Sequence, residues 1–313
     1  MTALAPDPAH VQASRQVCRR TAPNIWFSSH FLPKDRRAVV YCVVSVYDQL
    51  RQIINSKGAA DSEGEGCCEE ESPEKRKSVC HSVLDYLYRG EPTGKGELDG
   101  FHAVAQQYDL PRQPFDNLID ALIAEQSVQR YATWKRVNEQ LNLTAGSAGE
   151  LIVPAFAGDA ITDTARHQIH AWCTAMRLAV ILTHIPQQWK HGRLLLPLDD
   201  LVRFKLTEHD VSGFIEAKTC DGDPRWRDLM TFEADRARNL FRGGAQFLES
   251  INDQRVRRAV ATLGVLYSAL LETIERHNGD VFDLHPQWSY WQRLKRYPRA
   301  VKLAADPSHA SMF

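Results

Sequence analysis

The sequence lacks any strong excess of charge and any long apolar run. Its 38 basic and 39 acidic residues give a formal net charge of −1, so there is no overall field for nucleic acid. The longest apolar run, Ala38–Val46, is far shorter than the ~20 residues that a membrane-spanning helix needs. The first residues also lack the basic segment, apolar core and cleavage site of a secretory signal peptide. We therefore expect a cytoplasmic protein that binds no nucleic acid, with peripheral contact to a membrane left open.

Cysteine patterns that hold metals or form redox pairs are missing as well. The seven cysteines are an odd number, and only Cys67 and Cys68 are adjacent. The absence of a Cys-x-x-Cys pair and of zinc-type spacing favours reduced thiols. There is also no convincing alternating strand pattern and no repeat at a fixed period. These absences leave an all-α protein as the expected fold class.

Apolar residues recur at helical spacing along most of the chain. Ala38–Asn55 is apolar nearly all round at its start, which is typical of a helix in the middle of a bundle. Further helices are expected over residues 78–89, 98–108, 111–131, 141–156, 162–182, 198–204, 208–217, 225–250 and 256–277, with Thr207 as an N-cap. Residues 57–77, rich in Gly, Ser and Glu, predict a mobile acidic loop. We expect one domain over residues 21–302, an N-terminal extension over 1–20 and a C-terminal tail over 303–313.

The most informative stretch is Leu178–Pro197, an apolar helix that ends in polar residues before a Gly-Arg-Leu-Leu-Leu-Pro run. It resembles the second signature of the squalene/phytoene synthase family, where the helix ends in an Asp-rich motif. Other segments resemble the family in the same order: Phe31–Pro33, Leu87–Gly90, Leu118–Trp134, Ala145–Gly149, Phe232–Arg238 and Tyr267–Ile274. The resemblance spans residues 24–296. It implies a single isoprenoid-synthase-like helical bundle around a central apolar pocket.

The chain departs from the family at both acidic motifs. Family members hold Mg²⁺ with carboxylates on two facing helices, and the metal neutralises a leaving diphosphate. The first motif falls here on Arg51, Gln52 and Asn55, and the second on His184, Gln187 and Gln188. We therefore expect a divergent member that has lost both Asp-rich motifs. No metal cofactor is expected, unless other carboxylates substitute and bind Mg²⁺.

The resemblance implies a set of candidate site residues. Substrate-binding roles are expected for Asp48, Arg51, Asn55, Gln187, Gln188, Lys190, Arg193 and Tyr267, and catalytic roles for His184 and Glu125. An arginine offers paired donors for phosphate oxygens, and a histidine exchanges protons near neutral pH. The alternatives are structural: Arg51 in a salt bridge to Asp48 or Glu125, His184 as a helix-end histidine, and the two glutamines as helix caps.

Two functions follow from the resemblance. The first is binding of an isoprenoid or prenyl diphosphate, with a prenyl-transfer step in isoprenoid biosynthesis. The second is a non-catalytic relative that acts as a binding or assembly protein, since the family includes an assembly factor for a respiratory complex. A metal site built from His184, His191 and Glu125 is a weaker alternative, because Pro186 interrupts the helix between the histidines. The aromatic and basic segment Trp288–Arg299 is expected to pack on the bundle or to contact a membrane or a protein partner.

Overall fold

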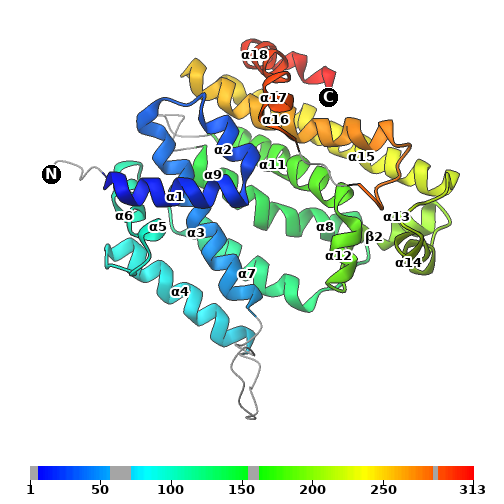
Figure 1. The fold of residues 1–313 in the computed structure, drawn as a ribbon, viewed down its shortest axis with the longest axis horizontal. Helices are drawn as coiled ribbons and strands as arrows, with labels where there is room; N and C mark the ends of the chain where they lie inside the picture. The colour runs from blue at the N-terminus through cyan, green and yellow to red at the C-terminus, as the bar shows by residue number, and fades with distance from the viewer. Residues whose placement is uncertain (1–5, 57–71, 154–161, 285–287) are drawn as a thin grey trace. The chain divides into compact units, whose positions relative to one another are not determined.

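The computed structural model describes residues 6–56, 72–153, 162–284 and 288–313 of the chain. These residues are predominantly helical, which confirms the all-α class (Figure 1). The chain packs as two compact units, residues 1–126 and residues 127–313. The single domain over residues 21–302 and the central apolar pocket stay predictions. No helix in the described ranges is both long and apolar enough to cross a membrane.

The first unit is organised around one buried helix, α3. Its elements are α1 (Pro8–Thr21), α2 (Pro23–Ser29), the short 3₁₀ turn η1 (Lys34–Arg36), α3 (Arg37–Asn55), α4 (Pro73–Arg89), α5 (Gly96–Asp99), α6 (Phe101–Gln107) and α7 (Gln113–Ser127). The first half of α3 is apolar on every side, and α1, α4, α5 and α6 all pack against this helix. The expectation of a central bundle helix at residues 38–55 is confirmed.

Two boundaries in the first unit differ from the sequence-based expectation. Helix α4 begins at Pro73, where the Ser72 side chain caps it by accepting a hydrogen bond from the backbone N–H of Lys75. The expected loop over residues 57–77 is therefore wrong for its last five residues, because a serine followed by proline starts a helix there. Residues 57–71, with Cys67 and Cys68, lie outside the described residues. The expected extension over residues 1–20 contains α1, which buries Ser14 against α3 and α5.

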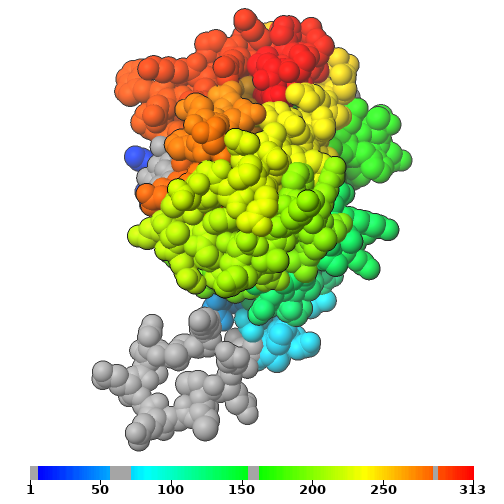
Figure 2. All heavy atoms as spheres, turned by 90° about the vertical axis from the view of Figure 1, so that its right-hand side faces the viewer, coloured from blue at the N-terminus to red at the C-terminus, as the bar shows by residue number. Residues whose placement is uncertain are grey.

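The second unit holds the remaining elements. They are the strand β1 (Arg130–Tyr131), α8 (Trp134–Leu141), the π-helical turn η2 (Asn142–Gly146), α9 (Ser147–Ile152), α11 (Asp163–Thr183), α12 (Ile185–Lys190), β2 (Leu194–Pro197), α13 (Leu198–Arg203), α14 (Glu208–Ala217), α15 (Pro224–Gly244), η3 (Ala245–Ser250), α16 (Gln254–Arg276), α17 (Tyr290–Leu294), α18 (Tyr297–Ala305) and η4 (Pro307–Met312). The helices α13, α14 and α15 form the yellow-green face in Figure 2.

The core of the second unit lies around α11, which packs on both α15 and α16. Trp172 on α11 is 1% exposed, and its ring contacts those of Phe241, Phe247 and Phe313 edge-on. Gly264 on α16 lies directly against the same indole, which leaves no room for a side chain there. The expected tail over residues 303–313 is thus packed against this core, since Phe313 contacts it.

A two-stranded parallel pair was not expected from the sequence. Arg130 pairs with Leu194 and Tyr131 with Pro197. The expectation of no strand is wrong at these residues, because a two-residue strand is too short to show alternation and β2 is buried along its whole length. The expected cap at Thr207 is confirmed, since Thr207 and Asp210 form a reciprocal capping box at the start of α14.

The small residues before α11 serve close packing. The chain bulges into a π-turn at Asn142–Gly146, which overlaps the family-like segment Ala145–Gly149. A Cβ atom at Gly149 would come within 2.6 Å of the Cys173 sulfur on α11. A larger residue at Gly149 would therefore push α9 away from α11.

Candidate functional site

The last two turns of α3 carry Arg51, Gln52 and Asn55, the positions where the family resemblance leads us to expect the first acidic motif. The side chains of Arg51, Gln52 and Asn55 are exposed there. The end of the helix is fixed by two other helices, because the Ile54 carbonyl accepts hydrogen bonds from Arg76 on α4 (2.8 Å) and from Gln126 on α7. These bonds satisfy a carbonyl that a helix end otherwise leaves unpaired. Neither Arg76 nor Gln126 was expected at the site, since a local pattern does not reveal which distant side chain closes a helix.

The only acid on α3, Asp48, accepts a hydrogen bond of 2.7 Å from the Gln52 side chain one turn later. This contact takes one of the two carboxylate oxygens. Within the described residues, Arg51 makes no ion pair with Asp48 or Glu125. The salt-bridge alternative for Arg51 is therefore not what the structure shows. Arg51 is thus an exposed arginine close to a helix end that Arg76 and Gln126 fix.

Glu125 lies on α7, next to Gln126. Its side chain is buried, with 8% of the residue exposed. Burial of a carboxylate is costly unless polar partners surround it. Glu125 is thus a buried residue of the first unit, and its catalytic role stays a prediction.

His184 ends α11 and begins α12. Its Nδ1 atom lies 2.9 Å from the Val180 carbonyl oxygen and 3.0 Å from the Thr183 hydroxyl. A carbonyl can only accept, so Nδ1 carries the proton in the neutral ring. This contact makes His184 a helix-end residue, as the structural alternative expected. Any acid–base role would have to use Nε2.

The two glutamines at the positions expected for the second acidic motif, Gln187 and Gln188, differ in their contacts. The Gln188 amide nitrogen donates a hydrogen bond of 2.8 Å to the Ile181 carbonyl in the last turn of α11. This bond fixes the orientation of the amide, because a flipped amide would place two acceptor oxygens together. The side-chain oxygens of Gln187 and Gln188 are buried without a hydrogen-bond partner within the described residues. Gln188 therefore caps a helix end and presents an acceptor, which suits a hydrogen-bond donor rather than a phosphate oxygen.

The loop after α12 is held by Arg130, a residue that the sequence analysis placed in a family-like motif without assigning a role. Its guanidinium donates to the Gly192 carbonyl (2.7 Å) and to Glu208 (2.6 Å), and it stacks over the Trp189 ring at 5.0 Å. Lys190 is exposed at the end of α12 and Arg193 is half-buried. Arg130 thus orders the segment that carries both basic candidates.

Tyr267 lies on α16, half-buried, where its phenol interacts electrostatically with Arg293. The structure therefore places the expected residues in two groups, one in each unit. Asp48, Arg51 and Asn55 share the end of α3, with Glu125 on α7 in the same unit. The second unit carries His184, Gln187, Gln188, Lys190 and Arg193 along one short stretch, with Tyr267 on a separate helix.

A buried charged cluster in the second unit was missed by the sequence analysis. Arg236 on α15 bonds both Glu233 (2.6 Å) and Asp200 (2.8 Å), and its guanidinium stacks on the Trp134 ring at 4.4 Å. Glu233 is fully buried, and its second oxygen has no hydrogen-bond partner within the described residues. Burial is the main reason that the pKa of Glu233 rises to about 8, with the nearby Asp200 adding to it. Glu233 is therefore protonated at neutral pH.

The side chains of Arg51, Gln52, Asn55, His184, Gln187 and Gln188 offer no carboxylate to a Mg²⁺ ion. Mg²⁺ binds hard oxygen ligands, and a guanidinium three residues from Asp48 repels it. In the described part of the chain, no three His, Cys, Asp or Glu side chains lie close enough together to hold a metal ion.

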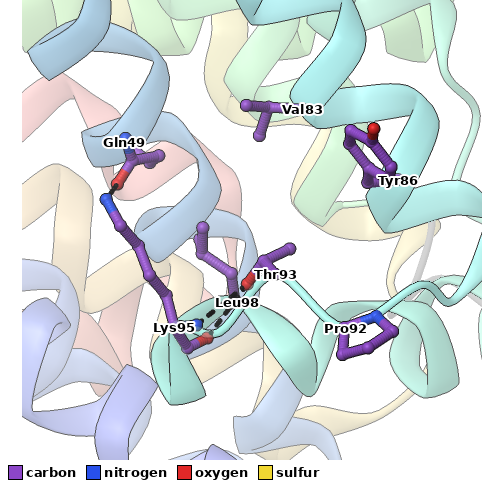
Figure 3. A pocket seen from close by; sticks show the side chains of 7 residues that line it. All are labelled: Gln49, Val83, Tyr86, Pro92, Thr93, Lys95 and Leu98. Carbon is purple, nitrogen blue, oxygen red and sulfur yellow. Dashed lines mark hydrogen bonds between the residues drawn. The ribbon is translucent and has the colours of Figure 1, made fainter.

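One hollow in the first unit is distinct from the candidate residues. It has a volume of about 230 Å³ and is lined by Gln49, Val83, Tyr86, Pro92, Thr93, Lys95 and Leu98. Figure 3 shows the Lys95 ammonium reaching the Gln49 side chain, with a bond of 2.8 Å. Because Lys95 is already engaged by Gln49, this hollow offers little to a charged ligand.

Known proteins place the chain in a family. The family model for squalene/phytoene synthase matches residues 18–292. The 15-cis-phytoene synthase of Synechococcus elongatus is 24% identical over 310 residues, covering 96% of this chain and 94% of that protein. A dehydrosqualene synthase solved in complex with ligand aligns with a TM-score of 0.81 at 16% identity, over 95% of this chain and 96% of that one.

A third similarity agrees with these. Squalene synthase HpnC from Alicyclobacillus acidocaldarius aligns with a TM-score of 0.70 at 22% identity, over 86% of this chain and 94% of that one. The solved structures confirm the expected isoprenoid-synthase-like, all-α fold. The family match covers most of the chain and confirms the resemblance seen in the sequence. This chain is therefore a member of the squalene/phytoene synthase family.

Proposed function

We propose that this protein binds a prenyl diphosphate and transfers its prenyl group in isoprenoid biosynthesis, without the Mg²⁺ clusters that aspartates hold elsewhere in the family. The observation that carries the proposal is the end of α3, where Arg51 stands exposed and without an ion-pair partner in the described residues. Membership of the family and the similarity to phytoene synthases support the isoprenoid class of substrate.

Arg51 would bind diphosphate oxygens and neutralise part of their charge, as Mg²⁺ does elsewhere in the family. A guanidinium offers several N–H donors in a plane and stays charged at any physiological pH, so it can bind two phosphate oxygens at once. The bonds from Arg76 and Gln126 to the Ile54 carbonyl hold the backbone beneath it. Lys190 and Arg193 are further candidate phosphate contacts in the second unit, on the stretch that Arg130 orders.

The reaction would need a base as well as an anion site. In prenyl transfer, the allylic C–O bond breaks and the diphosphate leaves with the electron pair. A double bond of the acceptor then attacks the cation, and the product loses a proton. Nε2 of His184 and the carboxylate of Glu125 are the candidate acceptors of that proton.

A second candidate function is a non-catalytic binding or assembly protein. The observation that favours it is the use of His184 and Gln188 to close the end of α11. Both occupy positions of the replaced motif, and both have structural partners that would be sufficient reason for their presence. In this case the protein would keep the fold and an isoprenoid ligand or a protein partner, and would release no diphosphate.

Product analysis separates the two functions. The purified chain is incubated with farnesyl or geranylgeranyl diphosphate, once with Mg²⁺ and once with EDTA. Released diphosphate is assayed and the lipid extract is analysed by mass spectrometry. The proposal expects a prenylated product in both buffers, with less product from the Arg51→Ala variant. Binding of the substrate with no product in either buffer would favour the second candidate.

A further inference from the structure

The surface segment Trp288–Lys302 combines exposed aromatic rings with charge of one sign. It contains five of the 38 Lys and Arg residues of the chain and none of its 39 acidic residues. The rest of the chain is therefore net negative, so this positive charge is local. Its basic residues are Arg293, Lys295, Arg296, Arg299 and Lys302.

Two aromatic residues of this segment are exposed at the surface, while Trp288 and Tyr297 are half-buried. Trp291 is 70% exposed and Tyr290 is 47% exposed, and both lie on α17, a helix in which no residue is buried. A Trp that is this exposed gains nothing from the protein core, although burial of an indole is strongly favourable. The expectation that the segment packs its aromatics on the bundle is therefore wrong for these two residues.

The segment is nevertheless anchored to the second unit. Helix α18 buries Ala300, Leu303 and Ala304 and packs extensively on α16, where the exposed Arg299 pairs with Glu272, while Lys302 remains exposed. Arg296 stacks on the Trp288 ring at 4.7 Å. The orange-red spheres of these helices stand at the surface in Figure 2. The positive charge and the exposed rings thus have a fixed support.

We propose that Trp288–Lys302 docks the protein on an anionic lipid surface. Indole and phenol rings favour the boundary between lipid headgroups and acyl chains, because one end of each ring is polar and the other apolar. Basic side chains near such a surface are attracted by its negative potential. Two adjacent exposed rings and charge spread over two helices fit a broad charged surface better than a single pocket. The mode is peripheral, and it does not depend on prenyl diphosphate binding.

Flotation of the full chain with lipid vesicles tests this proposal. One set of vesicles is phosphatidylcholine alone, and the other is phosphatidylcholine mixed with phosphatidylglycerol. We expect binding to the anionic set only, with loss of binding as salt is raised, since salt screens exposed charges. Equal binding to both sets, or binding to neither, would overturn the proposal, and an acidic protein partner would then explain the charge better.

Paired variants locate the contact. Lys295→Glu with Lys302→Glu should reduce binding about tenfold or more, because each reversal replaces attraction by repulsion. The matched control, Lys34→Glu with Lys135→Glu, changes two exposed lysines elsewhere and should bind nearly as the parent does. Trp291→Ala should weaken binding, whereas Val202→Ala, at a residue 74% exposed on α13, should not. Melting curves by circular dichroism confirm that each variant is folded. Equal losses in test and control variants would place the contact elsewhere.

Discussion

Gln52 donates a hydrogen bond of 2.7 Å to Asp48, one turn earlier on α3. The only carboxylate of this helix is thus held by an amide on the same helix face, and the neighbouring Arg51 is left exposed. The resemblance to the family leads us to expect Mg²⁺-binding aspartates at the corresponding turns. Here the same turns present a cation directly. In the proposed function, an anionic ligand meets that cation without a metal between them.

The first prediction concerns Arg51. The change Arg51→Ala should weaken binding of a non-hydrolysable farnesyl diphosphate analogue by about 1–3 kcal/mol, the usual cost of removing a charged hydrogen-bond donor. Titration calorimetry measures the change. Arg20→Ala is the matched control, because Arg20 is an exposed arginine on α1 in the same unit. An affinity for the analogue that is unchanged in Arg51→Ala would remove Arg51 from the site.

The second prediction concerns Gln188. In Gln188→Glu, a carboxylate faces the Ile181 carbonyl in place of the amide donor, so the free energy of unfolding should fall by about 1–3 kcal/mol at neutral pH. The loss should shrink as pH falls towards the ordinary glutamate pKa of about 4.3, because the carboxyl in the folded protein takes up a proton above that pH and can donate again. Gln188→Met is the comparison, since it removes the hydrogen bond without adding charge. Urea unfolding at several pH values measures the free energy of unfolding of both variants. A loss in Gln188→Glu that does not change with pH would contradict the contact between Gln188 and the Ile181 carbonyl.

The third prediction concerns Glu233, whose pKa burial raises to about 8 from 4.5. The folded protein then keeps a proton that the unfolded chain releases above about pH 4.5. The contribution of Glu233 to stability is therefore present below that pH and is lost as pH rises towards 8. The full loss is on the order of a few kcal/mol. In Glu233→Gln this part of the pH dependence should vanish, so the variant should gain stability over the parent as pH rises.

Asp235→Asn is the control for Glu233, because its side chain lies on the same helix and is 61% exposed. Its difference from the parent should change little with pH. Unfolding in urea from about pH 5 to about pH 8.5 spans the range in which the Glu233 proton is lost and gives both comparisons. A parallel pH profile for the parent and for Glu233→Gln would mean that Glu233 is ionised in the folded protein.

The fourth prediction concerns Gly264, where α16 touches the buried indole of Trp172. Gly264→Ala would push a methyl group into that ring and should lower the free energy of unfolding by about 1–3 kcal/mol. Gly213→Ala is the opposite case: Gly213 lies inside α14, and a methyl group there would have no neighbouring atom within 4 Å. It should raise stability by about 0.5–1 kcal/mol, as alanine does in an open helix. Thermal melts of both variants measure these changes. Similar effects at both glycines would contradict the assigned contact between Gly264 and Trp172.

Much of this fold follows from local patterns. The apolar run of α3, the capping box at Thr207 and the end of α11 at His184 are all set by neighbours in the chain, so periodicity and cap residues predict them. The start of α4 is also set by neighbouring residues, Ser72 and Pro73. It was not predicted, because the Gly- and Ser-rich residues before it favoured a loop. The strands β1 and β2 could not be predicted, because their pairing joins residues that are far apart in the sequence.

The candidate site was only partly predictable for the same reason. The family resemblance indicated the replaced positions on α3 and α12. It did not indicate that Gln126 and Arg76 close α3, that Arg130 holds the Gly192 loop, or that Arg236 joins Glu233 to a carboxyl from another helix. Such contacts depend on which helices come together, and single-sequence periodicity carries no information on that choice.

The central claim is that this family member binds a diphosphate without Mg²⁺. Calorimetric titration of the non-hydrolysable farnesyl diphosphate analogue, once with Mg²⁺ and once with EDTA, tests it most directly. The account predicts the same dissociation constant in both buffers, and a weaker one for Arg51→Ala in both. Binding that requires Mg²⁺ would contradict the account, because other carboxylates would then have replaced the lost aspartates. Absence of binding in both buffers would contradict it as well and would leave the assembly function.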